Sequence, residues 1–138
     1  MVIAIAIVAV IVVLFTIIFF HELGHFVAAR AAGVKVLEFG IGFPPRLFAV
    51  KRGDTLYSFN LILLGAFVKP LGEQDPTIQG SLAGKSPWIR MGVNAAGPVA
   101  NGLLAFVLLA VSLMIPTEVI VGGEGVKVMR VTEGSPAM

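Results

Sequence analysis

Cysteine is absent from the 138-residue sequence. The chain therefore has no disulfide framework, thiolate zinc ligand, iron–sulfur cluster or cysteine nucleophile, and any metal must be held by His, Asp, Glu or amide groups. Charge is also scarce, because charged residues make up 13% of the chain and ten Lys and Arg stand against eight Asp and Glu. No basic surface is available to hold a phosphate backbone, so we expect no nucleic acid partner.

Hydrophobic residues, in contrast, make up 57% of the chain, more than an ordinary soluble domain carries. Residues 2–20 are apolar with a single exception, and a helix of that length rises about 28 Å, close to the roughly 30 Å of bilayer hydrocarbon. Apolar character resumes after His21 and Glu22, so we predict a first transmembrane helix over residues 1–32 with this polar pair inside or at the edge of the membrane. The alternative is a signal peptide cleaved near residues 29–31, but no basic segment precedes the run, which is longer than a normal signal.

Residues 33–87 change character, because glycine and proline recur too often for a long helix. We predict short strands over Val34–Phe39, Arg46–Lys51, Leu56–Leu63 and Ala66–Lys69. The stretch Lys51–Thr55 is typical of a hairpin connection. Because much of the segment is apolar, we expect a small membrane-associated β-hairpin or sheet that packs on protein or lines a wet cavity.

A second apolar segment, residues 88–115, is long enough to span the bilayer with some tilt. Residues 116–138 are glycine-rich and soluble in character, and we expect a new domain to start there and the chain to be a fragment. Basic residues gather between the two spans and none precedes the first, which predicts a cytoplasmic location for residues 33–87 and both termini outside. The predicted fold class is an α-helical membrane protein with two transmembrane helices, multi-pass in the cell membrane. The sequence does not indicate an oligomeric state.

The pentapeptide His21-Glu22-Leu23-Gly24-His25 carries the clearest chemical signal. Helix positions i and i+4 lie about 40° apart, so both imidazoles can reach one zinc ion, and Glu22 is placed to take a proton from a water molecule that the metal activates. Chance would produce this motif in roughly one of a thousand sequences of this composition. Two incidental histidines are the alternative, but an unpaired cluster of this kind is costly in a membrane, so the motif indicates a zinc hydrolase.

Four motifs in order resemble the amino-terminal half of site-2 proteases of the bacterial RseP type, which are intramembrane zinc metalloproteases. These motifs are HELGH, Gly40–Pro45, Tyr57–Asn60 with Leu64–Glu73, and Asn94–Asn101. The resemblance covers essentially the whole chain. It implies that His21 and His25 are Zn²⁺ ligands and that Glu22 is the general base.

The stretch from Gly97 to Asn101 matches the family's Gly-x-x-x-Asn motif, which implies a place near the active site and a role in holding the substrate or the oxyanion. A spacing of seven residues puts Asn94 and Asn101 on one helix face with Pro98 between them, and we expect that face to look inward. Asn94, Gly97, Pro98 and Asn101 are therefore the predicted substrate-binding residues. Packing of small residues between helices is the alternative.

Two further segments extend the resemblance. Gly65–Gly72 resembles the family's membrane-associated β-hairpin, which implies an edge offered to an extended substrate, with a structural loop as the alternative. Residues 128–137 resemble the opening of the PDZ domain that such proteases insert on the outer side. The family's third zinc ligand, an Asp in a Leu-Asp-Gly motif, has no counterpart here, so we expect this chain to carry two of three ligands and to be inactive alone.

The resulting hypothesis is a zinc-dependent intramembrane endopeptidase with its active site toward the cytoplasm. By resemblance, its partners are the lipid bilayer and single-span transmembrane substrates such as anti-sigma factors. A membrane metalloprotease of the HtpX or Ste24 kind, with a downstream Glu as third ligand, is one alternative. A membrane anchor or adaptor without catalysis is the other.

Overall fold

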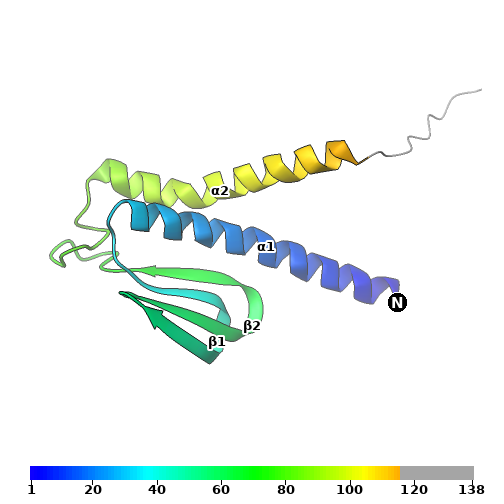
Figure 1. Cartoon of the computed structure of the whole chain (residues 1–138), viewed down its shortest axis with the longest axis horizontal. Helices are drawn as coiled ribbons and strands as arrows, with labels where there is room; N and C mark the ends of the chain where they lie inside the picture. Colours follow the sequence, from blue (N-terminus) through cyan, green and yellow to red (C-terminus); the bar gives the residue numbers. More distant parts are fainter. Residues whose placement is uncertain (116–138) are drawn as a thin grey trace, which may run out of the picture.

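The computed structural model describes residues 1–115, in the order helix, strand, strand, helix (Figure 1). The elements are α1 (Val2–Ala31), β1 (Val36–Arg52), β2 (Thr55–Pro70) and α2 (Pro87–Met114). Helix α1 lies between α2 and the β-hairpin and contacts both (Figure 1). Two long helices with a small sheet between them in sequence were predicted, and this part of the fold class is confirmed. The predicted PDZ-like opening lies outside the described residues.

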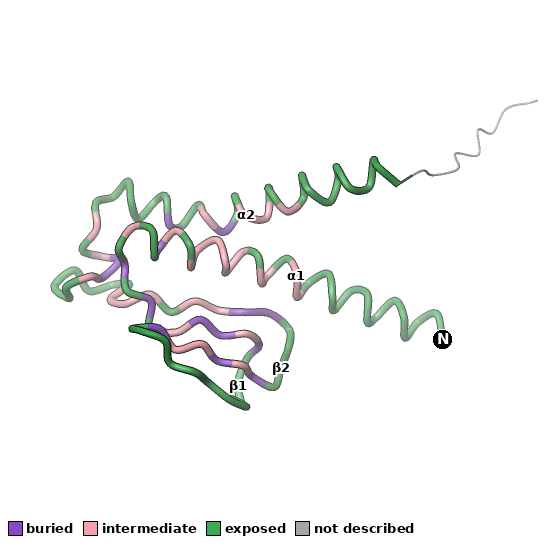
Figure 2. Tube along the Cα trace, in the orientation of Figure 1, coloured by how far each residue is buried: buried purple, intermediate pink, exposed green. Residues whose placement is uncertain are grey.

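Both helices are long and apolar enough to cross a membrane. Every residue from Met1 to Leu14 is exposed (Figure 2), whereas the core helix of a soluble protein would bury such side chains. The second half of α1 packs between α2 and β2, and cleavage near residues 29–31 would remove this packed segment. The packing favours a retained membrane helix over the signal-peptide alternative.

The β region contains two long bent strands where four short ones were predicted. The bend in β1 centres on Gly42, whose φ is +78° and whose α-hydrogen faces β2 so closely that a Cβ would lie 2.9 Å from the Asn60 carbonyl oxygen. The buried Asn60 side chain holds this bend by donating to the carbonyls of Gly42 at 3.0 Å and Ile41 at 3.3 Å. Glycine and proline therefore bend the strand here without ending it, because the neighbouring strand continues to supply hydrogen bonds.

The bend allows β1 to pair with β2 twice. Its first arm, residues 36–41, lies between residues 66–70 and residues 56–59 of β2, and its second arm, residues 46–52, forms the antiparallel hairpin with β2. The hairpin closes where it was predicted, through a two-residue turn in which Gly53 has a φ of +61°. Residues 66–70 consequently form an outer arm of the sheet.

A small core fastens the carboxyl-terminal end of α1 to the start of α2. It consists of buried apolar side chains from both helices, the turn after α1, β1 and the loop before α2: Ala29, Val34, Val36, Leu82 and Val93. Backbone hydrogen bonds tie the loop to Lys35, directly before β1, through the Leu71 N–H at 2.8 Å, and close the loop on itself from Leu82 to Leu71 at 2.9 Å. This core holds the beginning of α2 against the end of α1.

Candidate metal centre

The two histidines of HELGH lie one turn apart on α1 and face α2, and both are half-buried. Their Nε2 atoms are 3.1 Å apart, and the rings stand nearly perpendicular, at 81°. In a tetrahedral zinc site with Zn–N bonds of 2.0–2.1 Å, two ligand nitrogens lie about 3.3 Å apart. The spacing of the imidazoles therefore fits two ligands of one zinc ion.

The orientation of His25 is fixed by the backbone of α2. Its Nδ1 lies 2.8 Å from the Val93 carbonyl oxygen, which can only accept, so Nδ1 carries the proton and donates it. The Nε2 of the neutral ring then has a free lone pair. This arrangement is the usual support of a metal-binding imidazole, in which the second ring nitrogen donates to a carbonyl.

The orientation of His21 depends on Asn101 of α2. The Asn101 Nδ2 lies 3.3 Å from the His21 Nδ1, while the Asn101 Oδ1 is buried without a hydrogen-bond partner among residues 1–115. An amide has nearly the same shape when its oxygen and nitrogen are exchanged. With that exchange, the His21 Nδ1–H donates to the Asn101 Oδ1, the Asn101 Nδ2 takes the buried position without a partner among residues 1–115, and the His21 Nε2 presents a free lone pair beside that of His25.

Gly97 lets the backbone of α2 come close to the two Nε2 atoms. A Cβ at this buried position would lie 2.7 Å from the His21 Nε2 and would also collide with the His25 Nε2. Any side chain there would push the imidazoles or α2 out of this arrangement. The residues present thus fit a zinc ion on two counts: the spacing of the imidazoles and the support of both rings.

Glu22 faces the sheet rather than α2. Its Oε2 accepts a hydrogen bond from the Val68 backbone N–H of β2 at 3.1 Å. No group of three or more His, Cys, Asp or Glu residues that could hold a metal occurs within residues 1–115, so Glu22 is not arranged as a third ligand. The structure thus turns the Glu22 carboxylate toward β2 and away from the histidines, and its role as a proton acceptor stays a prediction.

The predicted inward face of α2 is only partly inward. Gly97 is buried and Asn101 reaches His21, whereas Asn94 and Pro98 are exposed. At 100° per residue, the contact stripe runs through Val93, Gly97 and Asn101, and Asn94 lies about 20° beyond Asn101 while Pro98 lies farther round. The expectation of an inward position was therefore wrong for Asn94 and Pro98.

Three features of the site were not predicted. The Val93 carbonyl and the Val68 N–H are backbone groups, which carry no residue-type signal. The third feature is Gly24, where a Cβ would clash with the Ala96 carbonyl and lie 2.8 Å from the Ala100 Cβ. Here a signal was available, because Gly24 lies inside HELGH and Ala96 and Ala100 are small residues four apart, a pattern typical of close helix contacts in membranes.

The fold and the site together define a class: a membrane protein with an HExxH motif on one apolar helix, whose two histidines are supported by a second apolar helix. The comparisons with known proteins agree, since the model of peptidase family M50 matches residues 9–134. The chain belongs to peptidase family M50, the site-2 protease family. The predicted resemblance is thereby confirmed, and the alternative of a protease of the HtpX or Ste24 kind is set aside.

Individual relatives point the same way. The zinc metalloprotease RasP of Geobacillus kaustophilus is 45% identical over 74 residues, which cover 54% of this chain and 18% of that protein. The regulator of sigma-W protease RasP of Bacillus subtilis is 41% identical over 73 residues, covering 53% and 17%. A Treponema pallidum protein is 37% identical over 137 residues, covering 91% and 30%. The chain thus spans less than a third of the length of these relatives.

Proposed function

We propose that this chain forms the amino-terminal part of a zinc-dependent intramembrane endopeptidase. The observation that carries the proposal is the pair of Nε2 atoms 3.1 Å apart, each on a ring whose other nitrogen is held by α2. Membership of family M50 supports the same chemistry. We further propose that the third ligand lies outside this chain, which would then be inactive alone.

His21 and His25 are the residues that would hold zinc, and Glu22 would be the general base. Zinc bound there would act as a Lewis acid that activates a water molecule near neutral pH and polarises the scissile carbonyl. Glu22 would accept the proton of the attacking water and return it to the leaving amine. The Val68 N–H holds the Glu22 carboxylate in a fixed place, and the Val93 carbonyl and Asn101 keep the imidazoles oriented.

The outer arm of β2 suits an extended substrate. A transmembrane helix must unwind before a peptide bond can be hydrolysed, and pairing with a strand edge satisfies the freed backbone groups. Residues 66–70 pair with β1 on one side, and Val68 turns its N–H away from that pairing toward Glu22. An extended segment lying along this arm would pass beside the proposed base.

The substrate class follows from the membrane setting. We propose single-span membrane proteins, including anti-sigma factors, in line with the name of the Bacillus subtilis relative as a regulator of sigma-W protease. We propose the cell membrane as the location, with the active site toward the cytoplasm. This orientation follows the basic residues between the two spans.

Asn94, Gly97, Pro98 and Asn101 stay proposals as substrate-binding residues. Gly97 and Asn101 already border the two histidines. Pro98 has no N–H, so the Asn94 carbonyl lacks its helical partner on the exposed face of α2. That carbonyl could accept a hydrogen bond from a substrate backbone.

The substitution Glu22→Gln tests the proposal in the full-length protease that contains this chain. Cleavage of a single-span substrate should fall by roughly 10²–10⁴-fold, the usual contribution of a general base, while zinc content stays at the wild-type level. Glu73→Gln, at an exposed carboxylate in the loop before α2, is the matched control and should cleave normally. Wild-type cleavage by Glu22→Gln would contradict the mechanism, and no cleavage by the wild type would favour the adaptor alternative.

A further inference from the structure

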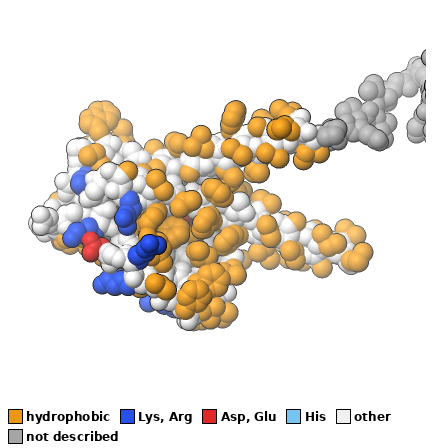
Figure 3. All heavy atoms as spheres, viewed as in Figure 1, with side chains coloured by type: hydrophobic (Ala, Val, Ile, Leu, Met, Phe, Trp, Pro, Cys, Tyr) orange, Lys and Arg blue, Asp and Glu red, His pale blue; other side chains and the backbone are white. Residues whose placement is uncertain are grey.

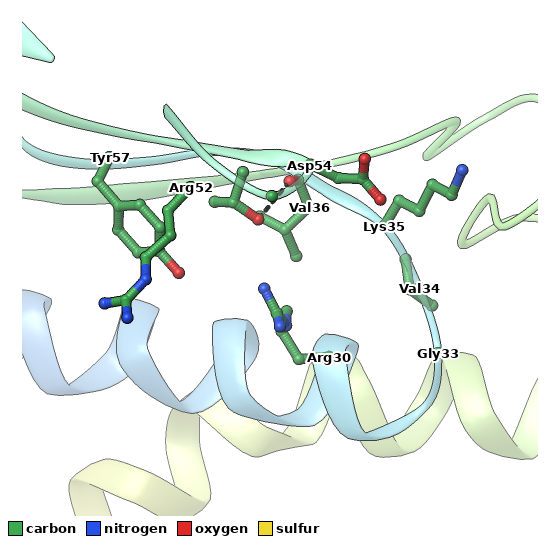
Figure 4. A pocket seen from close by; sticks show the side chains of 10 residues that line it. Arg30, Gly33, Val34, Lys35, Val36, Arg52, Asp54 and Tyr57 are labelled. Carbon is green, nitrogen blue, oxygen red and sulfur yellow. Dashed lines mark hydrogen bonds between the residues drawn. The ribbon is translucent and has the colours of Figure 1, made fainter. Parts of the chain in front are cut away.

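A cavity of about 580 Å³ opens between the end of α1 and the β-hairpin, away from the histidines. Its lining comes from the last turn of α1, the start of β1 and the hairpin turn (Figure 4). Thr55 is buried in this lining and its hydroxyl donates to the Val36 carbonyl at 2.9 Å. A volume of this size lies within the range of small-molecule sites.

Basic side chains dominate the lining. Arg30, Lys35 and Arg52 contribute three positive charges, and Asp54 is the only acidic residue among the lining residues. None of the three basic groups forms an ion pair with a carboxylate of residues 1–115, where the salt bridge that is present joins Arg46 and Glu38. The cavity therefore carries a net positive charge.

The charges are not spread evenly. Figure 4 shows the Arg52 guanidinium and the Tyr57 hydroxyl at one end of the cavity, Arg30 near its middle, and Asp54 and Lys35 toward the opposite end. Phe26 supports this arrangement, because the Arg30 guanidinium lies 5.9 Å from its ring and the Tyr57 ring packs edge-on against it at 6.0 Å. Two forked donors and one hydroxyl donor thus converge on the same cavity.

The helix dipole accounts for only part of the positive charge in the cavity. Arg30 lies in the last turn of α1, where a cation is favourable next to the helix dipole. That role requires neither Arg52, which comes from the end of β1, nor the cavity between them. The convergence is better explained by a ligand that carries negative charge.

The apolar surface near the cavity points to a membrane lipid as the negatively charged ligand. The two elements that supply Arg30 and Arg52 also carry exposed apolar side chains: Val27 on α1, and Leu47, Phe48 and Val50 on the second arm of β1. Figure 3 shows the Lys and Arg side chains gathered at one end of the molecule, next to a surface that is otherwise mostly hydrophobic. The cavity lies where apolar surface gives way to basic surface, the level at which lipid headgroups are found.

We propose that this cavity binds the phosphodiester headgroup of an anionic membrane lipid. Arg30 and Arg52 pair with the phosphate oxygens, and the Tyr57 hydroxyl donates to the same group. The acyl chains lie along the exposed apolar side chains of α1 and β1. The site is separate from the histidines and its occupancy does not depend on catalysis.

Native mass spectrometry of the 138-residue chain in detergent, titrated with phosphatidylglycerol or phosphatidylcholine, tests the site. The wild type should prefer phosphatidylglycerol. The double variant Arg30→Gln/Arg52→Gln should bind it roughly 10- to 30-fold more weakly, as expected for two lost basic contacts. The matched control Lys51→Gln/Arg90→Gln removes the same charge outside the cavity lining and should keep wild-type affinity.

A third variant guards against an effect on folding. Tyr57→Phe keeps the ring that packs on Phe26 and removes only the hydroxyl, so it should weaken phosphatidylglycerol binding without lowering the unfolding temperature. Equal losses in the two double variants, or no loss in either, would overturn the proposal. Inorganic phosphate or glycerol 3-phosphate that displaces phosphatidylglycerol at equal concentration would assign the cavity to a soluble phosphate and overturn the lipid source.

Discussion

At the scale of single residues, the two histidines differ in what holds them. His25 donates to a backbone carbonyl, which no side-chain substitution at Val93 can remove, whereas His21 relies on the Asn101 amide. The orientation of one proposed ligand is therefore built into the path of α2, and that of the other depends on one side chain. A substitution at Asn101 should affect metal affinity without touching a ligand.

We predict that Asn101→Leu weakens zinc affinity by roughly 10- to 100-fold, the usual effect of removing the group that orients a metal-binding histidine. Competition with a zinc chelator, on the full-length protease, measures this. Asn94→Leu is the matched control, because Asn94 lies on the exposed side of α2, and its zinc affinity should stay at the wild-type level. Equal affinities for the two variants would remove Asn101 from its orienting role.

The zinc-binding chemistry of HELGH was the part of the site that the sequence predicted best. The HELGH spacing predicts a shared zinc site from helix geometry alone, and the structure places the two Nε2 atoms at a matching separation. The partners of Glu22 and His25 lie 46 and 68 residues away and are backbone atoms. No residue type marks such partners, so they become visible only when the elements are packed.

At the scale of elements, α1 uses two faces. Ile18 and Glu22, one turn apart, face β2, while His21 and His25 face α2. The contact with α2 is close because Gly24 lets the Ala96 carbonyl and Ala100 approach the backbone of α1. The glycine inside HELGH thus sets the helix separation on which both imidazole supports depend.

We predict that Gly24→Ala lowers the free energy of unfolding by about 1–3 kcal/mol, as expected for overpacking a close contact. It should also weaken zinc binding, because α2 must move away from α1. Gly92→Ala and Gly102→Ala are the controls, since a Cβ at either position meets nothing within 4 Å, and both should be neutral or slightly stabilising. Unfolding in a denaturing detergent, followed by circular dichroism, measures the difference, and a neutral Gly24→Ala would contradict this account of the interface.

The elements themselves were predictable to different degrees. Apolar length predicts the two helices, because a span needs no tertiary information to be recognised. The strands were predicted in the right region but broken into four, since the continuity of β1 through Gly42 depends on the buried Asn60. The hairpin turn was predictable because Gly53 is the residue that its positive φ requires.

At the scale of the whole molecule, the position of the histidines along α1 predicts how deep they lie in the membrane. His25 and His21 precede Arg30 by five and nine residues, or roughly 8 and 14 Å along α1. If Arg30 lies at headgroup level, the histidines lie a short distance inside the hydrocarbon. Water would have a short path to them from the side that carries the hairpin.

The predicted orientation can be tested directly because the natural sequence lacks cysteine. A thiol introduced by Lys51→Cys, next to the hairpin turn, should react with a membrane-impermeant maleimide in inverted vesicles but not in intact spheroplasts. Thr117→Cys, beyond α2, should show the reverse pattern. Labelling of Lys51→Cys from outside would contradict the cytoplasmic location of residues 33–87.

The account rests most heavily on the claim that the two histidines form half of a zinc site, and zinc content tests it most directly. The measurement compares the purified chain alone with the chain co-expressed with the carboxyl-terminal segment of a complete family M50 protease. We predict tight zinc at about one equivalent only in the co-expressed pair, retained by Glu22→Gln and lost by His25→Ala. Full zinc content in His25→Ala would contradict the claim, and tight zinc in the chain alone would contradict the proposal that the third ligand lies outside it.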